Sequence, residues 1–288
     1  MEALEKIWKI NTMKKVYIVG DSFSSNNWAS DTDVSDNAWH RLLGKQLDAE
    51  VVNKSLIGSS QDYAWTHLHL YQPSITSDDY VVVCLTHPAR FWFFENFPMI
   101  STIDQIENYE HMHGADPTSA AARNYIKYFQ RKTLDTLWLK NRLGWLADTA
   151  YTNGWKKPLI IYSMQIDDLD ESHYPDLSFS KGYLHDHISL PELPPGADYE
   201  TFVQPYDPRY NHMCLSNHLM LAEKIYQSLT ANITLDLTTN DFKKDIFNVA
   251  SDDLAFQQRE LSLPTMDMIK NHITAKKESI IPAQFRFK

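Results

Sequence analysis

The sequence predicts an α/β fold built on a parallel sheet. Three short runs rich in β-branched, apolar and aromatic residues, at 16–19, 51–53 and 80–85, are separated by segments with helical periodicity. A fourth run, 158–163, follows a further helical segment. The run at 80–85 is almost continuously apolar, which is typical of a parallel strand covered on both faces. Strands that alternate with helices pair in parallel through right-handed crossovers.

Four helices are predicted around these strands. The first begins at the cap residue Asp36 or Asn37, and the second ends before Pro73. The third covers residues 118–151, and the fourth runs from Leu215 to Leu229. Within residues 118–151, one face carries Leu134, Leu137, Trp138 and Trp145.

The chain divides into three parts by pattern. Residues 1–12 form a short amphipathic lead, and residues 13–230 carry the α/β pattern with long insertions near 91–155 and 165–211. Residues 231–288 form a C-terminal extension with weak helical patterns. The insertion 165–211 has few periodic segments and many turn residues, so we expect a lid or a binding loop there.

Composition excludes several classes of partner. The formal net charge is −10 and the chain has no basic run, so we expect no nucleic-acid partner. No apolar segment approaches the roughly 20 residues that cross a bilayer, and the N-terminus lacks the layout of a signal peptide, so we expect a cytoplasmic protein without a membrane partner. Cys84 and Cys214 are too few for a disulfide framework.

A serine follows the first strand at its carboxyl end. Gly20 permits a sharp turn after residues 16–19, and Ser22 then lies where open α/β sheets place their ligands. A serine in this position is either a nucleophile or the cap of the next helix. Asp21 is interpreted as a turn former that binds nearby backbone.

Three segments in order resemble the SGNH (GDSL-like) hydrolases, which are serine esterases on a three-layer α/β/α sandwich with flavodoxin-like topology. Gly20-Asp21-Ser22 matches the nucleophile motif, Asn53 and Gly58 match the second block, and His212 precedes the final helix as in the last block. The resemblance covers roughly residues 14–230, and some similar proteins occur in bacteriophages.

The resemblance implies a role for each matched residue. Ser22 is the nucleophile and His212 the base that takes its proton, a role that suits imidazole at neutral pH. The backbone N–H groups of Ser22 and Gly58 form the oxyanion hole.

Two positions depart from the family pattern. Where the family has its Asp, three residues before the His, this chain has Arg209, and Asp207 is the substitute that would orient His212. Where the family has an Asn after the third strand, this chain has Thr86-His87, so Thr86 or His87 is the third oxyanion donor.

These observations predict a serine esterase or acyl hydrolase that needs no cofactor. Its substrate would be a small acyl ester or an acetylated glycan, as for a carbohydrate O-deacetylase. The alternative is a catalytically decayed binding or structural protein on the same fold, such as a virion-associated phage component that uses residues 231–288 for a protein partner or an oligomer contact. A flavodoxin-like nucleotide site is excluded because the first turn has a single glycine.

Other residues carry weaker signals. Arg90, beyond the third strand, would bind an anionic substrate group or pair with a carboxylate, and Trp92 in the aromatic run 91–94 would line the substrate crevice or join the core. The segment His185-Asp186-His187 is the first place to look for a metal, yet zinc sites need three or four convergent ligands, so we expect none. His218 is interpreted as a structural helix residue.

Overall fold

The computed structural model describes the chain in several stretches. They are residues 13–25, 38–56, 58–88, 90–93, 97–100, 110–111, 114, 117–129, 131–189, 213 and 215–243. The lead 1–12 and residues 244–288 of the predicted extension lie outside them, as do residues 190–212 of the second insertion.

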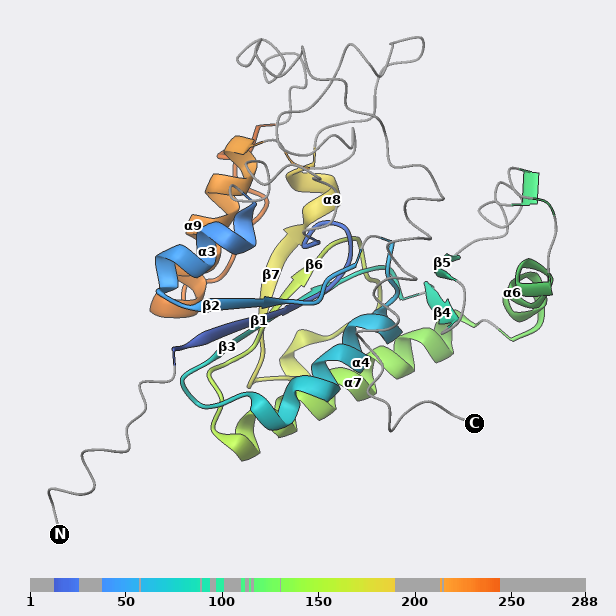
Figure 1. The fold of residues 1–288 in the computed structure, drawn as a ribbon, viewed down its shortest axis with the longest axis horizontal. Coiled ribbons are helices and arrows are strands. Elements are labelled where there is room, and N and C mark those ends of the chain that lie inside the picture. Colours follow the sequence, from blue (N-terminus) through green and yellow to red (C-terminus); the bar gives the residue numbers. More distant parts are fainter. Residues whose placement is uncertain are drawn as a thin grey trace, which may run out of the picture.

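Five strands form one parallel sheet in the order β2-β1-β3-β6-β7 (Figure 1). They are β1 (Lys15–Val19), β2 (Glu50–Asn53), β3 (Tyr80–Leu85), β6 (Leu159–Tyr162) and β7 (Ser178–Tyr183). This is the strand order of flavodoxin-like folds, and the predicted parallel α/β fold is confirmed. The chain passes from β1 outward to β2 and then back to β3 on the other side of β1. The carboxyl ends of β1 and β3 therefore flank the point where the strand order reverses.

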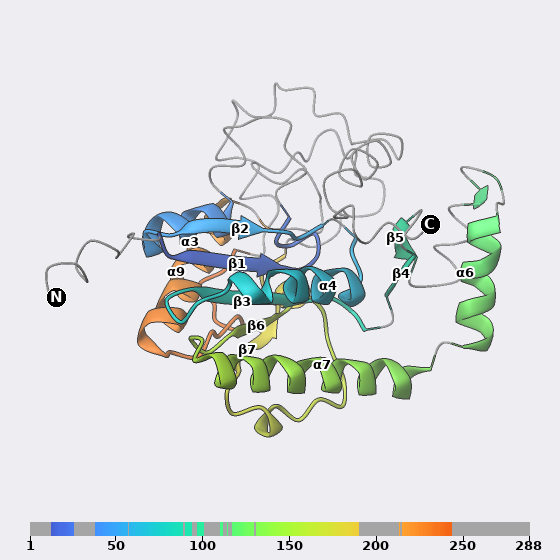
Figure 2. The ribbon, with the colours of Figure 1, turned by 60° about the horizontal axis from the view of Figure 1, so that its bottom comes forward.

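Helices cover both faces of this sheet (Figures 1 and 2). The helices of the described stretches are α3 (Trp39–Leu47), α4 (Gln61–Tyr71), α6 (Pro117–Tyr128), α7 (Lys132–Asn153), α8 (Leu184–His187) and α9 (Leu215–Ala231), with short 3-10 turns at Gln72–Ser74 and Glu171–His173. Helices α3 and α9 pack on one face together with α8, and α4 and α7 pack on the other. The three layers match the sandwich that the resemblance implies.

Alternation along the central strands divides the core into two halves. On β1, Val16 and Ile18 belong to the cluster under α3 and α9, whereas Tyr17 and Val19 belong to the cluster under α4 and α7. All six residues of β3 are buried and divide in the same way. A strand buried on both faces explains why run 80–85 is apolar without a polar alternation.

Residues 117–153 form two helices where the sequence predicted one. Helix α6 ends at Tyr128 and α7 begins at Lys132. Helix α6 stands away from the sandwich, while α7 runs along the sheet (Figure 2). Helix α7 buries Leu139, Leu143 and Leu146, and of the predicted face only Trp145 packs against this core. Leu134, Leu137 and Trp138 on that predicted face are 46%, 50% and 60% exposed.

The segment 165–189 contains regular structure that the sequence did not predict. Strand β7 pairs with β6 and completes the sheet, and α8 follows it directly. The outer edge of β7 is covered in part by residues 235–237, where Lys181 N–H donates to Leu235 O and Leu237 N–H donates to Lys181 O. The expectation of an irregular loop is therefore wrong for residues 178–187.

A small antiparallel pair lies beyond the carboxyl end of β3. Strand β4 (Phe91–Phe93) pairs with β5 (Phe97–Ile100), so the aromatic run begins as a strand. Trp92 lies in β4, and its side chain falls outside the described part. Among the helices in the described stretches, none combines the length and the apolar character needed to cross a membrane.

Candidate active site

Ser22 lies on a tight turn at the carboxyl end of β1. The turn is closed by Ser24, whose N–H and hydroxyl both donate to Asp21 O at 3.2 Å. The side chain of Asp21 accepts the N–H of Phe23 at 3.1 Å, which confirms its predicted role as a turn former. Asp21, Phe23 and Ser24 are buried, whereas Ser22 between them is partly exposed. The turn thus presents one serine to the outside and holds its neighbours inside.

Gly20 is required by close packing against β3. A Cβ at this position would lie 2.6 Å from Cys84 Cβ and 2.6 Å from Ser24 Oγ. The carbonyl of Gly20 accepts the N–H of Leu56 at 3.1 Å and the hydroxyl of Ser59 at 2.8 Å. The first residue of the motif is therefore fixed both to β3 and to the loop after β2. Burial raises the pKa of the Cys84 thiol, so this cysteine acts as a small apolar residue here.

Asp21 connects the ends of three strands. Its side chain is fully buried, and its Oδ1 accepts the hydroxyl of Ser163, at the end of β6, at 3.0 Å. Arg90, in the loop after β3, places Nη1 3.9 Å from Asp21 Oδ2. A buried carboxylate is tolerated only with such partners. Arg90 therefore forms the ion pair that was one of its two predicted roles.

The loop after β2 supports the serine turn from the other side. Asn53 Nδ2 donates to Ser24 O at 2.6 Å, and Asn53 Oδ1 accepts the N–H of Ser55 at 2.9 Å. Gly58 has a φ of 62°, in the left-handed region that favours glycine. Asn53 and Gly58 matched the family by sequence, and the hydrogen bonds of Asn53 give it a physical role at the serine turn.

Thr86 directly follows β3 at the same edge of the sheet. Its carbonyl accepts a hydrogen bond of 2.7 Å from the side-chain Nε2 of Gln61, which is the first residue of α4. Its hydroxyl is buried and has no hydrogen-bond partner in the structure as described. Thr86 thus lies at the same edge of the sheet as Ser22, with its hydroxyl buried, and its role as an oxyanion donor stays a prediction.

The two predicted partners of Ser22 lie outside the described residues. His212 and Asp207 fall in the stretch 190–212, so their roles stay predictions. The helix predicted after His212 is confirmed as α9, which begins at Leu215. His218 in this helix accepts the N–H of Trp39 at its Nδ1, at 3.3 Å, so it joins α9 to the start of α3.

His40 lies beside this junction and is buried. Burial, with smaller effects of His218 and Arg41, lowers the pKa of His40 to about 3, so its ring is neutral at physiological pH. Neither ring nitrogen has a hydrogen-bond partner in the structure as described. Helix α3 begins at the cap Ala38, one or two residues later than the predicted cap.

The predicted metal candidates do not converge. His185 and Asp186 are exposed and contact each other, with Nδ1 and Oδ1 2.9 Å apart, and His187 stacks on Tyr183. Across the described residues, no group of three or more His, Cys, Asp or Glu side chains is placed to hold a metal ion.

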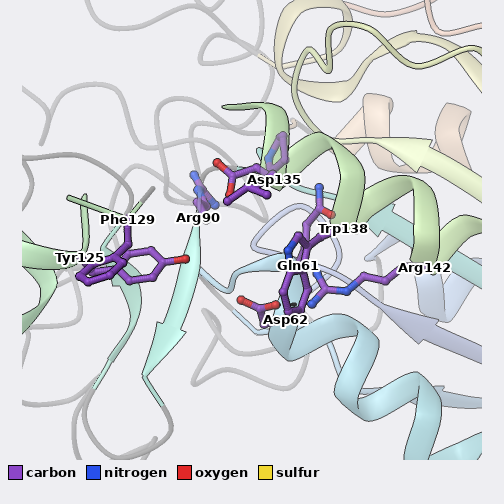
Figure 3. Close-up of a pocket in the computed structure, with 10 residues that line it drawn as sticks. Gln61, Asp62, Arg90, Tyr125, Phe129, Asp135, Trp138 and Arg142 are labelled. Atoms are coloured by element: carbon purple, nitrogen blue, oxygen red, sulfur yellow. Dashed lines mark hydrogen bonds and ion pairs between the residues drawn. The ribbon is translucent and has the colours of Figure 1, made fainter. Parts of the chain in front are cut away.

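A cavity of about 420 Å³ opens beside the serine edge of the sheet. It lies between α4, α6, α7 and the loop after β3, and both Gln61 and Arg90 line it (Figure 3). The sequence did not predict Ser163 or Gln61 as site residues, because neither stands in a motif. The pairing of β6 with β3 brings Ser163 to this edge, and the position of the start of α4 brings Gln61 there.

Comparison with known proteins gives a likeness of fold. No family model matches the chain, and no curated protein matches it. Among solved structures, the crystal structure of TesA has 15% identity and a TM-score of 0.40, over 76% of this chain and 100% of the other. A G-D-S-L family protein from Desulfitobacterium hafniense DCB-2 has 15% identity and a TM-score of 0.38, over 75% and 99%. Likeness of this extent does not assign an activity to this chain.

Proposed function

We propose that this protein is a serine hydrolase that cleaves ester bonds, with Ser22 as its nucleophile. The observation that supports it most is the position of the serine turn. Ser22 follows β1, next to the point where the strand order reverses, which is where open α/β sheets bind their ligands. The neighbours of Ser22 are buried and hydrogen-bonded to the segment after β2 and to the end of β6, while Ser22 itself is partly exposed.

The reaction proceeds in two balanced steps. In the first, His212 takes the hydroxyl proton of Ser22 as its Oγ attacks the ester carbonyl, and Asp207 orients the imidazole. The tetrahedral intermediate expels the alcohol, which receives the proton from His212, and an acyl-serine remains. In the second, His212 takes a proton from a water that attacks the acyl carbonyl, and it returns this proton to Ser22 Oγ as the C–O bond to the serine breaks and the acid is released.

The oxyanion of each intermediate needs preorganised donors. The backbone N–H groups of Ser22 and Gly58 supply two of them, and Thr86 supplies the third through its backbone N–H, since its hydroxyl is buried. One donor of this kind is worth about 2.7–4 kcal/mol in measured cases, so two suffice for substantial catalysis. The hydrogen bonds of Gly20 and Asn53 hold the serine turn in place before substrate binds. The entropy cost of ordering this turn therefore does not add to the activation barrier.

The substrate that we propose is a small acyl ester carried on a glycan, so that the protein acts as a carbohydrate O-deacetylase. The cavity beside the serine edge supports this choice over a free lipid ester, because its lining combines aromatic with polar and charged side chains.

A turnover assay with a paired variant tests the proposed reaction. The full chain is expected to hydrolyse p-nitrophenyl acetate, Ser22→Ala to lose at least about a thousandfold in kcat/KM, and Ser25→Ala, on the same turn, to keep most of its activity. Turnover by Ser22→Ala equal to that of the wild type would overturn the assignment of the nucleophile.

A second function is favoured by one observation. The Thr86 hydroxyl is buried, unlike a donor that must reach a substrate oxygen. This supports a binding or structural protein on a decayed hydrolase fold, such as a virion component that holds host glycans. In that case the wild type would show no turnover on any ester, while glycan binding would persist.

A further inference from the structure

The cavity beside the serine edge combines two kinds of lining. Its residues are Gln61 and Asp62 of α4, Pro88 and Arg90 after β3, Tyr125 and Phe129 at the end of α6, and Leu134, Asp135, Trp138 and Arg142 of α7. Figure 3 shows Tyr125 and Phe129 on one side, Asp62, Trp138 and Arg142 on the other, and Arg90 and Asp135 between them. A volume of about 420 Å³ is in the range of small-molecule sites.

The aromatic side chains of this cavity are unusually accessible. Trp138 is 60%, Phe129 67% and Tyr125 38% exposed. The rings of Tyr125 and Phe129 lie nearly parallel, with centroids 6.4 Å apart. Large aromatic surfaces left in contact with water at one place mark binding sites more often than single exposed residues do. Because Tyr125 and Phe129 lie on one side of the cavity and Trp138 on the other, a ligand between them would contact aromatic surface on both sides.

The polar side chains of the cavity nearly cancel in charge. Arg90 and Arg142 are opposed by Asp62 and Asp135, and Arg142 forms an ion pair with Asp62. The guanidinium of Arg142 also lies over the Trp138 ring, 5.7 Å from its centroid. A strongly anionic or cationic ligand would meet as much repulsion as attraction. A neutral ligand with several hydroxyls would find both donors and acceptors.

A long acyl chain fits this lining poorly. Half of the lining residues are polar or charged, namely Gln61, Asp62, Arg90, Asp135 and Arg142. An acyl chain would remove water from these groups and offer no hydrogen bonds in return, which is costly. A sugar ring offers both surfaces, because its C–H faces stack on the negative face of an aromatic ring and its hydroxyls bind planar polar groups.

We propose that this cavity is a binding subsite for one sugar ring of a neutral oligosaccharide. The ring packs on Trp138 and Phe129, and its hydroxyls bind Asp62, Arg142 and Asp135. The subsite adjoins the serine edge through two residues, since Gln61 donates to Thr86 O and Arg90 lies 3.9 Å from Asp21. That the bound sugar delivers its ester to Ser22 rests on the proposed function.

Binding to the full-length Ser22→Ala protein tests the subsite apart from hydrolysis. The sugar probes are xylohexaose, cellohexaose, maltohexaose, mannohexaose and N-acetylchitohexaose, and decanoate is the acyl-chain probe. Binding is measured by isothermal titration calorimetry and by saturation-transfer NMR. At least one oligosaccharide is expected to bind with a dissociation constant of about 1 mM or below. Trp138→Ala should weaken that binding about tenfold, and decanoate should not bind at the same place.

A control variant on the same helix makes this result specific. Tyr151 of α7 is 78% exposed and lies outside the cavity, so Tyr151→Ala should leave oligosaccharide binding unchanged. Asp62→Asn should also weaken binding, because it removes the anionic partner of Arg142 and alters the acceptors in the cavity.

Separate outcomes identify the failure of each claim. If no oligosaccharide binds, or if Trp138→Ala and Tyr151→Ala bind equally well, the subsite is wrong even when the wild type hydrolyses esters. If decanoate binds and Trp138→Ala abolishes it while no sugar binds, the cavity takes acyl chains and the proposal is overturned. If sugars bind as expected but the wild type hydrolyses no ester, the subsite stands and the proposed function fails.

Discussion

The hydroxyl of Ser163 donates a hydrogen bond of 3.0 Å to the buried carboxylate of Asp21, the residue that precedes the candidate nucleophile. This bond joins the end of β6 to the turn after β1, across the intervening strand β3. It makes the geometry of the serine turn depend on a residue that is distant in the sequence. Ser163 is therefore a positioning residue in our account.

Ser163→Ala is expected to destabilise the protein by about 1–3 kcal/mol, because a buried carboxylate oxygen loses one of its two donors. It should also reduce kcat more than it raises KM, since the turn is less well held. Free energies of unfolding from urea titration and ester kinetics measure both effects.

Ser172→Ala is the matched control for this change. The hydroxyl of Ser172 also donates to a carboxylate, Asp170 Oδ1, at 2.6 Å, but this pair is exposed. Water replaces the lost bond there, so stability should change by less than about 0.5 kcal/mol. Equal losses in the two variants would contradict the positioning role of Ser163.

Gly20→Ala is expected to be severely destabilising. The new Cβ would lie 2.6 Å from Cys84 Cβ and 2.9 Å from Cys84 O, and a backbone atom of a buried strand cannot give way easily. We expect a loss of about 1–3 kcal/mol or more, and loss of ester turnover.

Gly144→Ala tests the same substitution where there is room. Gly144 lies inside α7, and a Cβ there would meet nothing within 4 Å. Alanine is favoured over glycine in a helix by about 0.8–1 kcal/mol, so the melting temperature should rise slightly. A similar melting temperature for Gly20→Ala and the wild type would show that the packing of β1 on β3 at this point is not tight.

Stability should depend on pH through His40. The pKa of His40 is about 3 in the folded protein and 6.5 in the unfolded chain, so the unfolded chain binds more protons between these values. With respect to His40, the free energy of unfolding is therefore highest above pH 6.5. It decreases as the pH falls towards 3, by up to about 1.4 kcal/mol per pH unit.

His40→Phe should remove this part of the pH dependence, because the substituted ring cannot be protonated. His173, whose side chain is 73% exposed, supplies the control, and His173→Phe should retain the wild-type slope. The free energy of unfolding measured from about pH 7.5 to about pH 4.5 checks both, since this range spans the pKa of a histidine in an unfolded chain. A wild-type slope in His40→Phe would contradict a buried, neutral His40.

The central strands could be predicted from sequence because they are covered on both faces. Run 80–85 is apolar throughout, and it coincides with β3. Strand β7, with the sequence Ser178-Phe-Ser-Lys-Gly-Tyr183, escaped prediction because it lies at the edge and carries polar residues. An edge strand needs no continuous apolar run, so its sequence resembles that of a loop.

Helix α7 shows a different limit of the sequence. It has two apolar faces, one with Leu139, Leu143 and Leu146 on the sheet and one with Leu134 and Trp138 at the cavity. Periodicity identifies each face as apolar but does not say which of them packs on the core. The candidate site has a similar limit. Gly20 and Ser22 could be predicted because they stand in a motif, whereas Ser163 reaches the site only through the pairing of β6 with β3.

The central claim is that Ser22 is an activated nucleophile, and covalent labelling tests it most directly. The full chain is treated with a fluorophosphonate, and the site of the adduct is determined by mass spectrometry of its peptides. Our account predicts one adduct, on Ser22, that is absent from Ser22→Ala and present in Ser25→Ala. An unlabelled wild-type protein, or an adduct on another serine that persists in Ser22→Ala, would contradict it.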